Sequence, residues 1–497
     1  MIMDKKIITL LQRGCLALTF LLTFSCDSIL DINKDPFAAG DDQIAEQPGL
    51  LMTTVITGIS SDKVMETNLF NRWAQHYVGA GASVFSEADN YSIPAYPQTN
   101  TWSTYYVSAL KNASRGEQLA LGIGEQNTAA QFKIIQAFAF YHLTLMFEDI
   151  PFTESLNTDI LFPKGDTQEN VLKGIVQMID QAVADIDVGN NEKISSEDLL
   201  FKGDLNRWIK FANSIKIKTL MVLAENNPNY AKSRLEKAFN EDHVDELGEQ
   251  VQLDYYDDLT NANQFYKLHY QYAGGQSLFF YASNPFIDLL RGSNDPRIDI
   301  FYDRPEGTSE AVPHRGVDPG ARSSFTVTSS LSLHFISATS PDFWVTAAEM
   351  RFLRAEAILK GWISGDASDA DQYYKEGIIL NIIHLNNLAT VLDSGRGITQ
   401  GEFDTYIGGL PDLDNLSEAN AIKAVYQQGY IETFNRGMDA WTYVRRTGYP
   451  ENKPLPVDAV LSSHITRLPY SPSEVSANPN IPKQKALDLP MWFMSSN

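Results

Sequence analysis

Apolar side chains recur at intervals of three and four residues along most of this chain, which is the spacing of an α-helix with one buried face. Residues 166–187 show the pattern clearly, with apolar positions at Val171, Ile175, Met178, Ile179, Ala182 and Ile186. Asp166 with Glu169 predicts a capping box at the start of this helix, and Thr346 with Glu349 predicts a second one. The pattern therefore predicts an all-α fold.

The predicted helices come in pairs joined by short connections. We expect about four pairs, over residues 103–122 with 127–148, 166–187 with 204–226, 346–361 with 367–387, and 419–434 with 437–447. Small residues such as Ala137 and Ala357 occur where antiparallel helices need to approach closely. Paired helices of this length stack in tetratricopeptide-like (TPR-like) scaffolds, although no fixed sequence period is visible here. The sequence predicts TPR-like pairs in one large domain.

Long irregular segments separate these helices, and they are the expected place for function. They cover residues 86–101, 243–280, 303–343 and 450–497. Within the third, polar and apolar residues alternate over 324–335, which predicts at most a minor β-hairpin. Long loop insertions in a compact domain usually bind or catalyse, so the variable part of this protein is expected there.

Two of the loop segments combine aromatic rings with short polar side chains, which is the composition of a sugar-binding surface. The candidate ligand-binding residues are Tyr91, Tyr96 and Trp102 in the first segment and Tyr266, Tyr270 and Tyr272 in the second. The structural alternative is that these rings pin the loops to the helices. Trp73, Tyr77, Trp208 and Trp441 are instead expected in the core, because each lies on a predicted helix.

The excess of acidic residues argues against nucleic acid as a partner. Acidic residues outnumber basic ones by 62 to 39 over 497 residues, and the formal net charge is −23. Nucleic acid demands clustered Lys and Arg, so we expect no nucleic-acid partner.

The first 25 residues are typical of a bacterial signal peptide. A basic start with Lys5, Lys6 and Arg13 precedes an apolar run of about ten residues, which is half the length needed to cross a bilayer. Ser25 and Cys26 then resemble a lipobox, in which cleavage before the cysteine is coupled to its acylation. We expect residues 1–25 to be removed, lipid on Cys26, a tether over 26–48, and the binding domain over 49–497.

Motifs for enzymatic or metal chemistry are missing from the sequence. The eight histidines form no H-E-x-x-H or H-x-H pattern, and no cysteine pair remains after cleavage, so no metal is expected. Neither a G-x-S-x-G elbow nor a phosphate-binding loop is present, so we expect no cofactor and no catalytic residue.

Six short motifs in a constant order resemble the SusD/RagB family of nutrient-binding outer-membrane lipoproteins of Bacteroidetes, in its branch with a DxNxDP start. They begin at Asp31, Gly203, Asn294, Thr346, Trp441 and Arg467, and read DINKDP, GDLNRWIKFANS, NDPR, TAAEMRFLRAEA, WTYVRRTGYP and RLPY. Each motif alone is weak, whereas six in the family's order extend from the tether to residue 470.

The resemblance implies a TPR-like domain with a loop-rich ligand face, held at the outer membrane and facing outward. It also implies a partner, a TonB-dependent transporter of the SusC-like kind, and a nutrient that is most often a glycan and sometimes a peptide. No catalytic residue is carried over. Two alternatives stay open from the residues alone: a periplasm-facing TPR-like scaffold lipoprotein and a glycan hydrolase.

The lipobox generates a direct test. We expect radiolabelled palmitate to be incorporated into the wild-type polypeptide, because Cys26 is the residue that acylation would modify. The Cys26→Ser variant should carry no label and should be released from the membrane fraction. Equal labelling of both polypeptides would contradict lipidation at this position.

Overall fold

The computed structural model describes residues 41–494, apart from residues 66–67, 80–86, 94, 275–276, 306–311 and 392–395. Cys26 and most of the proposed tether therefore lie outside the described residues. Within the described part no helix combines the length and hydropathy that a bilayer span requires.

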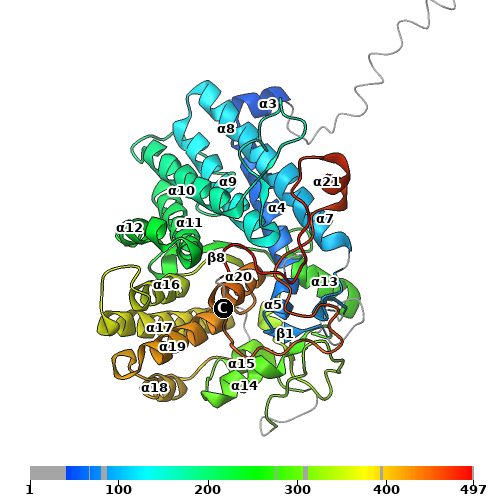
Figure 1. Ribbon diagram of the computed structural model, residues 1–497, viewed down its shortest axis with the longest axis vertical. Helices are drawn as coiled ribbons and strands as arrows, with labels where there is room; N and C mark the ends of the chain where they lie inside the picture. Colours follow the sequence, from blue (N-terminus) through cyan, green and yellow to red (C-terminus); the bar gives the residue numbers. More distant parts are fainter. Residues whose placement is uncertain are drawn as a thin grey trace, which may run out of the picture.

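The four expected helix pairs are present and confirm the predicted fold class. They are α8 (Lys111–Ile123) with α9 (Gln126–Phe147), α10 (Gln168–Asp185) with α11 (Leu205–Asn226), α16 (Ala347–Leu359) with α17 (Ala367–Val391), and α19 (Glu418–Glu432) with α20 (Gly437–Thr447). Figure 1 shows them following one another down one side of the molecule, with α20 near the centre. The π-helical turn η2 (Thr104–Leu110) extends α8 backward into α7 (Ala95–Ser103).

Several helices outside the pairs were not predicted. The helix expected around Trp73 and Tyr77 is α5 (Leu69–Trp73), but it ends at Trp73, and Tyr77 lies in a strand. Two unpredicted helices precede it, α3 (Asp41–Glu46) and α4 (Leu50–Val64). The others are α12 (Pro228–Ala238), α13 (Gln264–Ala273), α14 (Asn284–Gly292), α15 (Ile298–Phe301), α18 (Gln400–Gly408) and α21 (Pro472–Ala477). The prediction of continuous loops over 86–101, 243–280 and 450–497 was thus wrong in part, since each contains helical residues. Short amphipathic segments gave too few periodic positions to stand out.

The strands in the described residues are two to four residues long. β1 (Tyr77–Val78), β5 (Tyr281–Ala282), β7 (Ser330–Leu331) and β6 (Tyr302–Asp303) form an antiparallel sheet in that order. β2 (Ile150–Pro151) pairs with β3 (Gly165–Asp166), and β4 (Val251–Leu253) pairs with β8 (Asp342–Val345). The hairpin predicted over 324–335 does not form, because β7 pairs with β5 and β6 instead of a neighbouring strand.

The residues at the helix starts show which N-caps form as the local sequence indicates and where a tertiary contact takes the capping side chain away. Asp204 caps α11 by accepting from the backbone N–H of Asn206 and Arg207 at 3.0 and 3.3 Å. Thr346 caps α16 by accepting from Glu349 N–H. The box predicted at Asp166 is wrong: the carboxylate of Asp166 accepts from the backbone of residues 152 and 153, and Thr167 becomes the N-cap of α10.

Close approach within the pairs depends on glycines opposite aromatic rings. A Cβ added at Gly116 of α8 would collide with the ring of Phe132 on α9. A Cβ at Gly377 of α17 would meet Phe352 of α16 in the same way. A side chain at either glycine would push the two helices apart and open voids in an interior packed as densely as a crystal.

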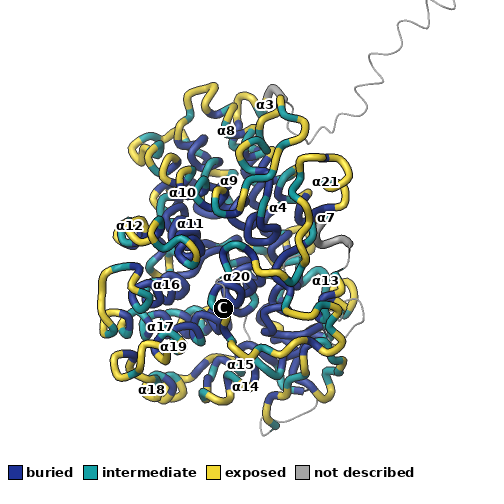
Figure 2. Tube along the Cα trace, in the orientation of Figure 1, coloured by how far each residue is buried: buried dark blue, intermediate teal, exposed yellow. Residues whose placement is uncertain are grey.

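One hydrophobic core extends from Leu51 to Phe493 and contains the expected tryptophans. Trp73, Trp208 and Trp441 are each at most 1% exposed, and Tyr77 is fully buried in β1. Figure 2 shows the inner helices dark and the exposed residues at the periphery. The core prediction for these four residues is confirmed.

Buried ion pairs join one helix pair to the next. Lys218 of α11 contacts Glu349 of α16 at 2.7 Å and Asp439 of α20 at 2.6 Å. Burial alone would raise the pKa of Asp439, but Lys218 and Arg436 outweigh it and hold that pKa below its usual range.

A second buried group lies nearby. Arg446 of α20 contacts Glu225 of α11 at 3.0 Å and donates to Glu356 of α16 at 2.7 Å. All three residues are nearly inaccessible, because their side chains are 1–4% exposed. Three helices from different pairs therefore meet on one guanidinium, as expected for an arginine that forms charge-assisted hydrogen bonds.

Replacing Arg446 should reveal how much this junction contributes. In Arg446→Met the carboxylate of Glu356 stays buried without its cation, whereas Glu225 keeps Lys360 at 3.0 Å, so we expect a loss of about 3–5 kcal/mol in the free energy of unfolding. Urea denaturation measures it. Arg234→Met on the exposed side of α12 is the control and should cost under about 1 kcal/mol. Equal losses in the two variants would contradict the role of Arg446.

Candidate functional site

α13 arises from a segment that the sequence suggested was a loop. The side chain of Asn263 accepts from the backbone N–H of Phe265 at 2.8 Å and caps the helix, and Gly274 ends it in the left-handed conformation with φ 60°. These two signals flank the helix in the sequence and could have predicted it. This correction affects the candidate site, because Tyr266, Tyr270 and Tyr272 lie on a helix and not on a loop.

The inner face of α13 is held by aromatic packing. Phe265 stacks on Phe280 with ring centroids 5.3 Å apart, and His269 lies 5.3 Å from Phe279. Burial lowers the pKa of His269 to about 4 against an ordinary 6.5, so the imidazole is neutral at pH 7. The inner face therefore fixes the rotation of α13 and decides which side chains face outward.

Two of the predicted tyrosines share the outer face of α13, and the third, Tyr272, lies on another side of the helix near its end. Tyr266 and Tyr270 stand one turn apart with their ring centroids separated by 5.8 Å. Tyr270 is 49% exposed and Tyr272 is 67% exposed. Tyr256, which the sequence reasoning missed, is 61% exposed eight positions before the helix. We call Tyr266 and Tyr270 the tyrosine face; the exposed rings of Tyr272, at the end of the helix, and Tyr256, in the segment before it, lie near this face in the sequence.

Exposed rings of this kind have a defined chemistry. Aromatic faces attract the C–H faces of pyranose rings, and neighbouring amides can bond the hydroxyl groups. Gln271 is exposed beside Tyr270, and Asn261 is exposed just before the helix. The signal that could have added Tyr256 is its acidic surrounding, Asp254 to Asp258, because charged neighbours keep a tyrosine near solvent.

Two of the three rings predicted in the first segment, Tyr91 and Trp102, are buried. Tyr91 is only 2% exposed and bonds His464 at 2.6 Å through its hydroxyl group. Trp102 is 5% exposed and lies edge-on to Phe147 and Tyr470. The assignment of Tyr91 and Trp102 to ligand contact was wrong, because these rings pin the segment to the core. The side chain of Tyr96 lies outside the described residues.

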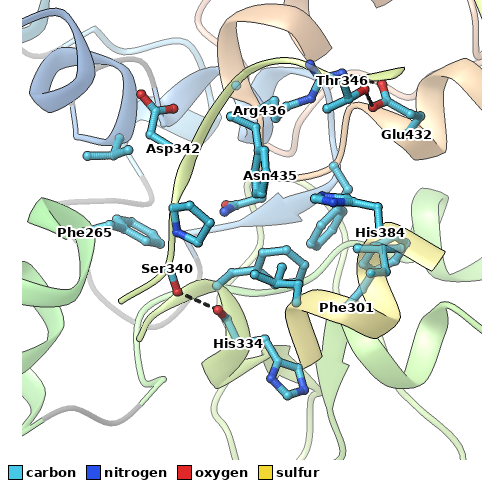
Figure 3. A pocket seen from close by; sticks show the side chains of 18 of the residues that line it. Phe265, Phe301, His334, Ser340, Asp342, Thr346, His384, Glu432, Asn435 and Arg436 are labelled. Atoms are coloured by element: carbon cyan, nitrogen blue, oxygen red, sulfur yellow. Dashed lines mark hydrogen bonds and ion pairs between the residues drawn. The ribbon is translucent and has the colours of Figure 1, made fainter. Parts of the chain in front are cut away.

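A small cavity lies behind the inner face of α13 (Figure 3). Phe265, Phe301 and His384 surround it, and its charged groups are paired: Lys63 with Asp342 at 3.6 Å, and Arg436 with Glu432. Its volume of about 60 Å³ has room for roughly four to six water molecules. Binding pockets for drug-sized molecules usually measure roughly 300–1,000 Å³, so this cavity is too small for an oligosaccharide.

A wider groove runs between α14, α18 and α19, with a volume of about 1320 Å³. Its size suits a chain-like ligand, yet its two aromatic residues, Tyr374 and Tyr406, are 2% and 6% exposed. Tyr406 is also committed to a buried network, since its hydroxyl donates to Asp295 at 2.8 Å. The groove therefore offers volume without an accessible ring.

Metal chemistry has no support in the part of the chain that the structure describes. No group of three or more His, Cys, Asp or Glu side chains there is placed to hold an ion. The tyrosine face is therefore the candidate that combines exposure, rings and neighbouring polar groups.

Comparison with known proteins places these features in context. The model of the SusD-like family, described as starch-binding and associating with the outer membrane, matches residues 41–470. A search of curated proteins finds no match. Among solved structures, a chitin-binding protein superposes with a TM-score of 0.75 at 23% identity, over 87% of this chain and 94% of that chain.

Two further solved structures are similar. A SusD homologue from Bacteroides fragilis gives a TM-score of 0.72 at 23% identity, over 90% of this chain and 98% of that chain. A chitin-binding SusD homologue from Flavobacterium johnsoniae gives 0.70 at 20% identity, over 87% and 93%. At these identities the likeness shows the fold.

The buried imidazole of His269 predicts a pH dependence. Its pKa is about 4 in the folded protein and 6.5 when exposed, so the unfolded chain binds the proton first as the pH falls. Stability is therefore full above pH 6.5 and is lost toward pH 4. From pH 7 to pH 5 the loss assigned to His269 is about 2 kcal/mol. In His269→Leu the fall in unfolding free energy should be smaller by that amount.

Urea denaturation at the two pH values measures this difference. Leu268→Ala is the control, because it disturbs α13 without removing a titratable group. An unchanged pH dependence in His269→Leu would show that this imidazole titrates normally.

Proposed function

Because the chain belongs to the SusD-like family, we propose that it is a cell-surface lipoprotein that binds a neutral glycan on its tyrosine face and delivers it to a SusC-like, TonB-dependent transporter. Family membership supports a starch-binding or related nutrient-binding role in association with the outer membrane. The observation that carries the glycan assignment is the exposed tyrosine face on a helix whose opposite face is locked in the core.

Charge supports a neutral ligand. Asp254 and Asp257 are exposed beside Tyr256, and Asp258 is exposed while bonding Asn261. Carboxylates around the rings would repel a polyanionic polysaccharide, and the net charge of −23 acts in the same direction at longer range. Neutral sugars meet no such penalty. The names of two similar structures, both chitin-binding, agree with a neutral polymer of this kind.

The proposal also includes a lipid anchor in the membrane and delivery of the bound glycan to a transporter. The lipobox at Cys26 supports attachment to a bilayer, since several acyl chains on one residue hold a protein stably. Residues 26–48 then act as the tether, and residues 49–497 as the binding domain. The transporter partner follows from the family resemblance. Capture without chemistry also follows, because neither the motifs nor the tyrosine face provides a catalytic group.

Truncating the rings of the tyrosine face should weaken glycan binding. In Tyr266→Ala/Tyr270→Ala the loss of two rings on the same side of α13 should lower the affinity for a neutral oligosaccharide by about tenfold. Calorimetry with chitin and starch oligosaccharides of matched length measures it. Phe162→Ala is the control, because Phe162 is similarly exposed at 42% and lies outside the tyrosine face.

Three outcomes distinguish glycan capture on the tyrosine face from glycan hydrolysis and from a scaffold that faces the periplasm. Unchanged affinity in the double variant would remove the tyrosine face from the proposal. New reducing ends after incubation with wild-type protein would replace capture by hydrolysis. Complete resistance of the protein to protease added to whole cells, with loss of that resistance after lysis, would favour a scaffold facing the periplasm.

A further inference from the structure

The connection between β2 and β3 presents bulky apolar side chains to solvent at a site remote in sequence from the tyrosine face. Leu161 is 80% exposed, the highest value among the large hydrophobic residues that the structure describes, and its neighbour Phe162 is 42% exposed. Ile160 and Pro163 on either side are half-buried. We call residues 160–163 the apolar tip. Apolar side chains held together in water usually mark an interaction surface.

The apolar tip is held in place by hydrogen bonds to its backbone. The side chain of Asn480 donates to the carbonyl of Phe162 at 2.7 Å, and that of Asn478 donates to Pro163 at 2.9 Å. Across the base of the loop, Lys164 N–H donates to the carboxylate of Glu154 at 3.0 Å. These bonds stabilise a conformation that exposes Leu161 and Phe162 even though burying them would be favourable.

The surroundings of the apolar tip extend its apolar character. Asn478 and Asn480 directly follow α21, and on that helix Val475 is 53% exposed. The charges that flank the tip, Asp159 and Lys164, have opposite signs, and Lys164 is paired with Glu154 at 3.0 Å.

The position of α21 indicates what covers this surface. The long axis is vertical in Figure 1, and both α21 and α3, the first described helix, lie toward the same upper end. Fourteen residues lie between Cys26 and Asp41, where α3 begins. Fully extended, that segment reaches about 50 Å. A lipid on Cys26 therefore limits how far α3 can lie from the bilayer, and the end of the molecule with α3 and α21 is the end that the anchor holds.

We propose that the apolar tip, with Val475, is a second membrane contact that inserts Leu161 and Phe162 into the interfacial region of the bilayer. This inference rests on the lipid anchor of the proposed function. Acyl chains supply the affinity, and the tip supplies orientation, because a tether alone leaves the domain free to rotate. The tip adds apolar area without adding charge.

An environment-sensitive label tests the contact in the full-length lipoprotein. After signal-peptide cleavage and acylation of Cys26 the chain has no free thiol, so Phe162→Cys can be labelled alone with an NBD fluorophore. The protein is reconstituted on phosphatidylethanolamine and phosphatidylglycerol vesicles. We expect a blue shift and protection from an aqueous quencher at position 162. Leu333→Cys is the matched control, because Leu333 is 49% exposed and lies beside α15 at the lower end in Figure 1.

The outcomes separate this inference from the anchor. If the protein floats with vesicles while the label at 162 stays as water-exposed as the label at 333, the tip contact is wrong and the anchor stands. If the protein does not float at all, both the anchor and the contact fail. A shift at 162 that requires the transporter in the same membrane would identify a protein contact instead and overturn the proposal.

A substitution measures the same contact without a label. Leu161→Ser/Phe162→Ser should transfer from donor to acceptor vesicles about tenfold faster than wild type, since two partly buried apolar side chains are lost from the membrane. Both side chains point into solvent, so the circular dichroism and oligosaccharide affinity should be unchanged. An equal transfer rate in a variant that still binds oligosaccharide would contradict membrane insertion.

Discussion

Charged side chains buried between the helix pairs determine how those pairs lie relative to one another. Lys218, Arg436 and Arg446 each contact carboxylates from helices far apart in the sequence. A buried charge without its partner costs several kcal/mol, so an arrangement that separates these groups is strongly disfavoured. Apolar contacts tolerate small sliding movements, whereas a guanidinium shared by three helices does not. The pairs therefore form one rigid framework.

That framework explains why the candidate surface is well defined. α20 is buried along almost its whole length and carries Arg436, Asp439 and Arg446 into the centre of the molecule. The cavity beside Arg436 is bounded on its other side by Phe265 of α13. α13 is thus mounted on the rigid part of the protein through its inner face, and its tyrosines are presented without a cost in loop ordering. A preorganised surface loses less entropy when it binds a flexible glycan.

The C-terminal segment packs against the end of α9 and against α20. Arg467 contacts the carboxylate of Glu148 at the end of α9, and Arg445 donates to the backbone carbonyls of Leu145 and Thr466 at 2.7 Å. The segment also carries Asn478 and Asn480, which hold the apolar tip. This irregular segment thereby connects the helix pairs with the exposed loop. Side chains and neighbouring backbone supply its hydrogen bonds, so it needs little secondary structure of its own.

Sequence alone determined the features that depend on neighbouring residues. Helical periodicity, the cap at Thr346 and the small residues between helices act within one or two turns, so the four pairs were predictable from them. The exposure of a ring is decided elsewhere: the hydroxyl group of Tyr91 meets His464, 373 positions away, and only that contact shows the ring to be buried. Tyr270 and Tyr91 both belong to segments that combine aromatic and polar residues, yet the ring of Tyr270 is exposed and that of Tyr91 is buried. Tertiary structure decided the site because side-chain burial depends on long-range packing, which a local pattern does not contain.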